Sequence, residues 1–271
     1  MSEYGNYTDR VFFSGNAGLP QLSAVLPIDP PPAGGPPQYE AGPWPTLYLL
    51  HGYSGSRNDW LRNSRIEMLA SQYRVAVIMP DGENRFWLDN PVTGENCGKM
   101  VGEELVQVTR GMFNLSDRRE DTAIGGLSMG GFGAIRNGLR YAETFGTVMA
   151  FSSALITEDF ADGKVDTADI MGIPMSYYTH VFGPAESFRG SEGDPVSLAK
   201  NCLKNGNAPR MYLACGTEDF LFANNQAYHD TLLGMQYDHV WFTAPGVHDF
   251  VFWNQAVTNG IKWWRCGDEE K

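Results

Sequence analysis

Residues 122–134, TAIGGLSMGGFGA, decide the fold that this sequence predicts. The first half is a short apolar run typical of a buried strand, and the second half is a run of small residues typical of a helix start. Between them, residues 126–130 read G-x-S-x-G, the pattern of a serine held on a strained turn from strand to helix. An ordinary glycine-rich turn is the alternative. The strand before and the helix after favour a nucleophile elbow with Ser128 as the nucleophile.

Strand and helix patterns alternate on both sides of this elbow. Short aliphatic or β-branched runs predict strands at residues 22–28, 46–50, 74–79, 122–126, 147–151, 211–215 and 239–244. Helical patterns occupy residues 103–112, 131–141, 224–235 and 251–264. Continuously apolar runs such as 47–50 and 75–79 are typical of parallel strands covered on both faces. The pattern predicts the α/β-hydrolase fold, with a central, mostly parallel sheet flanked by helices.

Two segments interrupt the alternation. Residues 29–37, DPPPAGGPP, predict a surface loop, because proline removes hydrogen-bond donors and restricts φ. Residues 157–195 are polar and rich in Gly and Asp, and a segment of this length is typical of a lid over an active site. Its aromatic residues include Tyr177, Tyr178, Phe182 and Phe188. We therefore predict one α/β-hydrolase domain over residues 1–271 with a lid-like insertion at 157–195.

The general base is expected after the last strand, because the chain order in this fold is Ser, then acid, then His. His248 follows the predicted strand 239–244, lies in a glycine-containing loop and precedes a helix. His229 lies in the middle of a predicted helix and His239 inside a predicted strand, so both are interpreted as structural. His248 is therefore the predicted base, with His239 as the nearest competitor.

The acid of the triad is expected directly after the preceding strand, where residues 215–219 read CGTED. A carboxylate held in this turn can accept the second N–H of the imidazole, which sets its tautomer and stabilises the imidazolium. Asp219 is the predicted acid and Glu218 is the alternative. Asp219 also suits a role as cap of the helix that follows.

The loop after the strand at 46–50 reads HGYSG, residues 51–55. In this fold, one oxyanion donor is the backbone N–H of the residue after the nucleophile, and the other comes from this loop. The predicted donors are the N–H groups of Met129 and Tyr53. His51 is interpreted as a brace for the loop backbone that does not transfer protons.

Two tryptophans follow strands at the same edge of the predicted sheet. They are Trp60, in residues 56–60, and Trp87, in residues 80–89. Because ligands of open α/β sheets bind beyond the carboxyl ends of the strands, Trp60 and Trp87 are predicted to line the substrate pocket. Core packing is the alternative for both.

Composition and charge limit the partners of the chain. Its 271 residues carry a formal net charge of −12, which argues against nucleic acid and anionic membranes and favours a monomer or small homo-oligomer. The four cysteines show neither a CxxC pair nor metal-ligand spacing. The N-terminal residues lack the pattern of a signal peptide, and no apolar run is long enough to span a membrane, which predicts a cytoplasmic protein.

Together these motifs resemble the esterase D-like group of α/β-hydrolases. The segments that carry the resemblance are LLHGYSG (49–55), NDW (58–60), PDG (80–82), GLSMGG (126–131), CGTED (215–219) and GVH (246–248). The group includes tributyrin esterases, S-formylglutathione hydrolases, and carbohydrate esterases that act on acetylxylan and feruloyl esters. The resemblance implies a hydrolase without metal or cofactor, whose serine is acylated and then deacylated by water.

The resemblance implies a serine carboxylic-ester hydrolase for short-chain or aromatic acyl esters, with acetyl or feruloyl esters of plant-derived oligosaccharides as the leading class. The HGYSG loop is closer to tributyrin and carbohydrate esterases than to the Leu-Thr-Cys-type loop of S-formylglutathione hydrolases, which leaves that thioesterase as the main alternative. An acyltransferase is a second alternative, because an alcohol can release the acyl-enzyme if a lid excludes water. A non-catalytic binding protein is disfavoured, since all three triad residue types are present.

Overall fold

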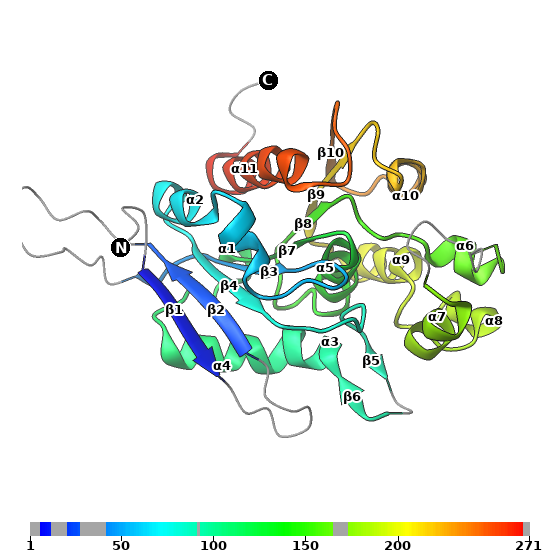
Figure 1. Cartoon of the computed structure of the whole chain (residues 1–271), viewed down its shortest axis with the longest axis horizontal. Coiled ribbons are helices and arrows are strands. Elements are labelled where there is room, and N and C mark those ends of the chain that lie inside the picture. The colour runs from blue at the N-terminus through cyan, green and yellow to red at the C-terminus, as the bar shows by residue number, and fades with distance from the viewer. Residues whose placement is uncertain (1–5, 12–20, 28–41, 91–92, 165–172, 268–271) are drawn as a thin grey trace, which may run out of the picture.

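The continuously apolar runs of the sequence form the centre of a mixed, mostly parallel sheet (Figure 1). The computed structural model describes residues 6–11, 21–27, 42–90, 93–164 and 173–267, so the predicted loop at 29–37 lies outside the described residues. The sheet has the strand order β1-β2-β4-β3-β7-β8-β9-β10. Its strands are β1 (Asn6–Val11), β2 (Gln21–Leu26), β3 (Thr46–Leu50), β4 (Ala76–Pro80), β7 (Thr122–Leu127), β8 (Thr147–Phe151), β9 (Arg210–Gly216) and β10 (His239–Ala244).

The strands from β4 to β10 in this order are parallel, and β2 pairs antiparallel with both β1 and β4. Each predicted strand is present, and its ends differ from the prediction by at most two residues. The strand β1 was not predicted, because its sequence NYTDRV has no apolar run. It forms through long-range backbone pairing with β2, which local sequence patterns do not report.

Helices cover both faces of the sheet, and β3 shows how the two layers divide. Leu47 and Leu49 belong to an apolar cluster with residues from 66–73 and 250–266, while Tyr48 and Leu50 belong to a cluster with residues from 105–112 and 129–140. The covering helices are α2 (Ile66–Tyr73), α4 (Leu105–Met112), α5 (Met129–Arg140), α9 (Pro195–Asn205), α10 (Phe222–Gly234) and α11 (Phe250–Cys266). Side chains alternate along a strand, so a strand that is apolar throughout is buried on both faces.

Residues 157–164 and 173–195 of the predicted insertion contain three short helices, which Figure 1 shows gathered at one end of the molecule beside α9 and α10. They are α6 (Thr157–Ala161), α7 (Met175–Phe182) and α8 (Ala185–Phe188). The centroid of the Phe182 ring lies 4.9 Å from the ring centroid of Phe86 and 5.7 Å from that of Phe132 on α5. The aromatic patch that was predicted in this segment therefore packs the insertion against the helix that follows Ser128.

The remaining elements are short and lie mostly in the loops that follow β3 and β4. They are α1 (Asp59–Asn63), β5 (Asp89–Asn90), β6 (Glu95–Asn96), α3 (Cys97–Lys99), a π-helical turn (Met100–Glu104) and a 3₁₀ turn (Arg119–Asp121). Over the described ranges, no helix combines the length and the apolar character that crossing a membrane requires.

Candidate active site

Ser128 lies at the junction of β7 and α5 in a strained backbone conformation. Its φ of 53° and ψ of −120° fall in a region that non-glycine residues rarely occupy. A Cβ atom at Gly126 would collide with the carbonyl group of Gly130, and one at Gly130 would collide with the carbonyl oxygens of Leu50 and His51. The two glycines of the motif therefore let the strand, the turn and the end of β3 approach closely enough to present the serine at the carboxyl edge of the sheet.

His248 joins Ser128 to Asp219 in one hydrogen-bonded chain. Its Nε2 lies 3.0 Å from the hydroxyl oxygen of Ser128, and its Nδ1 lies 2.8 Å from Oδ2 of Asp219. The three residues follow β7, β9 and β10, whose carboxyl ends meet at one edge because these strands are parallel. The structure thus brings together the three side chains that were predicted as nucleophile, acid and base.

The environment of Asp219 favours the carboxylate. Burial raises the pKa of Asp219, but hydrogen bonds from His248 and from the backbone N–H of Leu221, 2.9 Å away, hold that pKa below its usual value. The side chain is fully buried. A charged acceptor in this position keeps the His248 proton on Nδ1 and leaves Nε2 free to accept the proton of the serine.

The two alternatives to this triad make other contacts. Glu218 is exposed, and its carboxylate accepts the backbone N–H of Gly246 at 2.5 Å, which braces the loop that carries His248. His239 lies 2.8 Å from both Nδ1 of His229 and the carbonyl oxygen of Tyr237. In the described part of the chain, neither alternative contacts Ser128.

The HGYSG loop lies directly against the serine. A Cβ atom at Gly52 would be 3.4 Å from the Cβ of Ser128. The backbone N–H of Tyr53, in this loop, and that of Met129, at the start of α5, donate to no acceptor among the residues described. Two such N–H groups beside a nucleophile are able to bind a developing oxyanion, and the dipole of α5 adds to this at Met129.

His51 fixes the shape of that loop. It is buried, its Nε2 accepts the N–H of Gly82 at 3.0 Å, and its Nδ1 donates to the carbonyl oxygen of Gly52 at 2.8 Å. Burial lowers the pKa of His51 below 6.5, so the ring is neutral at neutral pH. These contacts agree with the interpretation of His51 as a brace.

We expect His51→Ala to lower the free energy of unfolding by about 2 kcal/mol, because it leaves a buried N–H and a buried carbonyl without partners. The stability of the variant should also depend less on pH. The unfolded chain binds a proton as the pH falls through 6.5 and the folded chain does not, so the His51 contribution is complete above that pH and is lost below it. Urea unfolding at about pH 7 and about pH 5 measures both effects, and equal pH slopes for the two proteins would contradict them.

The prediction that Trp60 and Trp87 line the substrate pocket is wrong, because both side chains are completely buried. The Trp60 indole donates to the carbonyl oxygen of Leu50 at 3.1 Å, and its ring packs against Phe151 and Phe250. The Trp87 ring packs edge-on against His51 at 5.0 Å. Both tryptophans support the site from the core and present no surface to a ligand.

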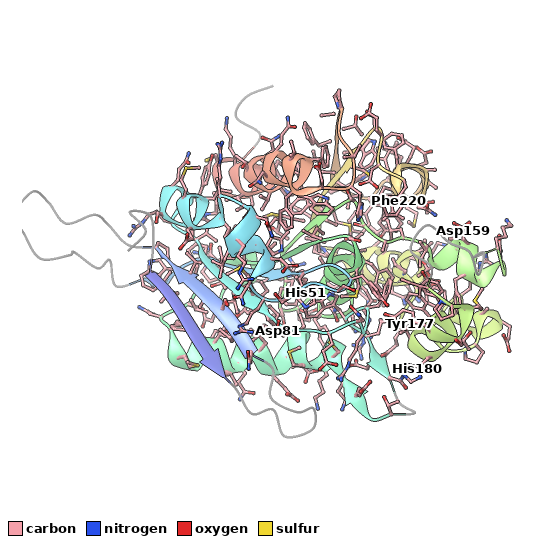
Figure 2. The ribbon with its side chains drawn as sticks, in the orientation of Figure 1. His51, Asp81, Asp159, Tyr177, His180 and Phe220 are labelled. Carbon is pink, nitrogen blue, oxygen red and sulfur yellow. The ribbon has the colours of Figure 1, made fainter. Side chains whose placement is uncertain are left out.

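Two aromatic side chains that were not predicted to lie at the site pack against the triad histidine. Phe220 is 39% exposed and its ring lies 4.5 Å from His248, while Trp253 packs edge-on against the same imidazole at 4.9 Å. Tyr177, in the insertion, packs edge-on against Tyr53, with the two ring centroids 5.7 Å apart. Figure 2 shows Phe220 and Tyr177 at the end of the molecule that carries α6. The position of Phe220 directly after Asp219 was the one signal that the sequence offered.

Trp253 also contacts a buried serine, Ser152, that lies beside the carboxylate of Asp219. The indole N–H of Trp253 donates to the hydroxyl of Ser152 at 3.0 Å. Ser152 is fully buried, has a φ of 44°, and contributes to the lowered pKa of Asp219. One tryptophan therefore packs on the imidazole and also holds a hydroxyl beside the carboxylate.

This arrangement can carry out acyl transfer. It combines a hydroxyl, an imidazole within hydrogen-bonding distance of it, a buried carboxylate on the far side of the imidazole, and two N–H groups for an oxyanion. Within the described ranges, no group of three or more His, Cys, Asp or Glu side chains is arranged to hold a metal ion.

Comparison with known proteins gives the same class of chemistry. The model of a family named Esterase matches residues 35–263. The chain is 41% identical to an acetyl esterase of Caldicellulosiruptor saccharolyticus, over 89% of this chain and 91% of that protein. It is 30% identical to the S-formylglutathione hydrolase of Mus musculus, over 73% of this chain and 72% of the relative. Among solved structures, the substrate-bound fluorophosphonate-binding serine hydrolase F of Staphylococcus aureus superposes with a TM-score of 0.81 at 26% identity, covering 96% of this chain and 98% of that one.

Proposed function

This chain belongs to the Esterase family and is a serine esterase, and we propose that it removes acetyl groups from hydroxyl-rich alcohols such as plant-derived oligosaccharides. The choice of acetyl as the acyl group rests on the 41% identity to an acetyl esterase along 89% of the chain. The observation that supports the reaction is the hydrogen-bonded chain from Ser128 through His248 to Asp219.

In the proposed reaction, the hydroxyl oxygen of Ser128 attacks the ester carbonyl while Nε2 of His248 takes its proton. The N–H groups of Tyr53 and Met129 bind the oxyanion, and Asp219 stabilises the imidazolium. His248 then gives the proton to the leaving alcohol, and an acyl-Ser128 intermediate remains. Water, deprotonated by His248, attacks the acyl carbon, the bond to the Ser128 oxygen breaks, and His248 returns the proton to that oxygen, which leaves acetate and free Ser128.

The main alternative is a thioesterase of the S-formylglutathione hydrolase type, which the 30% identity to the mouse enzyme supports. The two functions share the acyl-enzyme and differ in the leaving group, an alcohol in one case and a thiol in the other. Feruloyl esters are the alternative on the acyl side. Trp60 and Trp87, which were predicted to line the substrate pocket, are buried and give an aromatic acyl group no contact.

A panel of four substrates tests the proposal: p-nitrophenyl acetate, acetylated xylobiose, methyl ferulate and S-formylglutathione. We expect kcat/KM for acetylated xylobiose to exceed the values for methyl ferulate and S-formylglutathione by at least about tenfold, the effect of one well-placed polar contact. A higher value for S-formylglutathione would support the thioesterase instead. Turnover of none of the four would contradict an esterase function altogether.

A further inference from the structure

The turn that carries the N–H of Tyr53, the proposed oxyanion donor, is held by a side chain from another loop. Gly55 donates its backbone N–H to the carbonyl oxygen of Gly52 at 3.1 Å, which closes a β-turn. At the centre of this turn, Ser54 donates its N–H to Oδ1 of Asn84 at 2.7 Å. Because that N–H belongs to the peptide group directly after Tyr53, the hydrogen bond fixes how this part of the turn is oriented.

The turn needs support from outside because its backbone is strained. Ser54 has a φ of 58°, in the left-handed region that glycine adopts readily and serine does not. Such a conformation persists only where surrounding contacts hold it. Ser54 is exposed, so packing of its own side chain does not supply that hold. If the acceptor at Asn84 is removed, Ser54 can relax to a negative φ, and the N–H of Tyr53 changes direction with the turn.

Asn84 is itself placed by its neighbours in the loop after β4. On one side, Gly82 donates its N–H to Nε2 of the buried His51 at 3.0 Å, so this segment contacts the HGYSG loop at two points. On the other side, Phe86 and Trp87 have φ values of 48° and 58°, and both side chains are buried. Their packing in the core holds a backbone that neither residue adopts readily, and this sets the position of Asn84.

The insertion reaches the same two loops through Tyr177, on α7. The Tyr177 hydroxyl donates to the carbonyl oxygen of Asn84 at 2.5 Å. Burial raises the pKa of Tyr177, so the hydroxyl stays protonated and remains a donor. The ring of Tyr177 packs edge-on against Tyr53. One side chain of the insertion therefore contacts both the residue with the proposed oxyanion donor and the residue that braces its turn.

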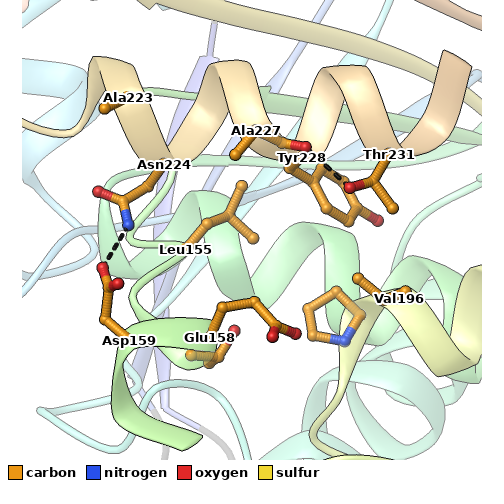
Figure 3. Close-up of a pocket in the computed structure, with 11 residues that line it drawn as sticks. Leu155, Glu158, Asp159, Val196, Ala223, Asn224, Ala227, Tyr228 and Thr231 are labelled. Atoms are coloured by element: carbon orange, nitrogen blue, oxygen red, sulfur yellow. Dashed lines mark hydrogen bonds between the residues drawn. The ribbon is translucent and has the colours of Figure 1, made fainter. Parts of the chain in front are cut away.

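Other hydrogen bonds tie the insertion to the rest of the molecule. Asn224 on α10 donates to Oδ2 of Asp159 on α6 at 2.8 Å (Figure 3). Nearer to Tyr177, the side chain of Asn90 donates to the carbonyl oxygen of His180 on α7 at 2.9 Å. Neither hydrogen bond involves the HGYSG loop. Removing the one from Asn90 therefore separates the anchoring of α7 from any effect on the oxyanion donor.

We propose that Asn84 and Tyr177 are positioning residues of the active site. Asn84 orients the turn that presents the N–H of Tyr53 to the oxyanion, and Tyr177 holds Asn84 in place from the insertion. The inference rests on the proposed esterase function, in which Tyr53 is an oxyanion donor. The insertion then contributes to the rate of the reaction through the backbone of the HGYSG loop.

The test measures kcat and KM for p-nitrophenyl acetate in the variants Asn84→Ala and Tyr177→Phe. Complete loss of one oxyanion donor lowers kcat by a factor on the order of 100 or more, and a misaligned donor keeps part of its effect. We therefore expect Asn84→Ala to lower kcat about tenfold and Tyr177→Phe about threefold, with KM changed by less than about twofold in both. Asn90→Ala is the matched control and should keep kcat within about twofold of the wild-type value.

Two further measurements distinguish positioning from a general loss of structure. Trifluoroacetone adds to an active-site serine as a hemiketal whose oxyanion occupies the oxyanion hole, so its Ki should rise by the factor by which kcat/KM falls. Tyr177→Phe should have no further effect on kcat in the Asn84→Ala background, because Tyr177 acts through Asn84. Stoichiometric labelling of Ser128 by a fluorophosphonate probe counts the folded active sites in each preparation.

Three outcomes would overturn the positioning role. They are a wild-type kcat in Asn84→Ala, a change in KM alone, and equal losses of kcat in Tyr177→Phe and Asn90→Ala. If Asn84→Ala does not fold, Tyr177→Phe decides, because it removes one hydroxyl and keeps the ring against Tyr53. A wild-type protein that does not hydrolyse p-nitrophenyl acetate contradicts the esterase function itself, whereas an active wild type with unaffected variants contradicts only the positioning role.

Discussion

Replacing Ser128 with alanine is expected to lower kcat for p-nitrophenyl acetate by a factor on the order of 10⁶, while the protein remains folded. The Ser128 hydroxyl is the one hydroxyl in the described ranges that hydrogen-bonds to Nε2 of His248. Without it, the imidazole has no bound nucleophile to activate and no acyl-enzyme forms. Absorbance at the p-nitrophenolate band measures the turnover, and circular dichroism checks the fold.

The matched control for this variant is Ser153→Ala. Ser153 is a buried serine close to the start of α5, and its hydroxyl has no hydrogen-bond partner among the described residues. This variant should keep most of the turnover and should still be labelled on Ser128 by a fluorophosphonate probe, whereas Ser128→Ala should not be labelled. Substantial turnover by Ser128→Ala would falsify the assignment of the nucleophile.

Asp219→Asn is expected to lower kcat by about 10⁴-fold, with a much smaller change in KM. The asparagine is nearly isosteric, so the packing around the loop should survive. It cannot, however, stabilise the imidazolium, and its amide N–H₂ can turn toward Nδ1 and favour the wrong tautomer of His248. Pre-steady-state measurement of p-nitrophenolate release shows whether acylation of Ser128 is the step that slows.

Glu218→Gln is the comparison for this variant, because Glu218 is the adjacent carboxylate and was the alternative acid. It braces the loop through the N–H of Gly246, and a glutamine oxygen can still accept that hydrogen bond. We expect its kcat to fall by less than about tenfold, the range for a weakened hydrogen bond. A larger loss from Glu218→Gln than from Asp219→Asn would reverse the assignment of the acid.

The sequence by itself determined the sheet and the residues that meet at its edge. The elbow around Ser128 is recognisable because a strained turn between a buried strand and a packed helix requires glycines at fixed positions. Asp219 and His248 could be predicted because each follows a strand. Parallel strands bring their carboxyl ends to the same edge of a sheet, so residues that follow them lie close together. These are local or topological constraints, so they can be read along the chain.

The tertiary structure alone decided which side chains are exposed beside the triad. Trp60 and Trp87 follow strands as Phe220 does, yet the two tryptophans are buried by distant elements while Phe220 stays exposed beside His248. Likewise, Asp159 on α6 and Asn224 on α10 are hydrogen-bonded to each other although they lie 65 residues apart in the chain. Burial and cavity shape depend on packing between elements remote in sequence, and a single sequence carries no local signal for that packing.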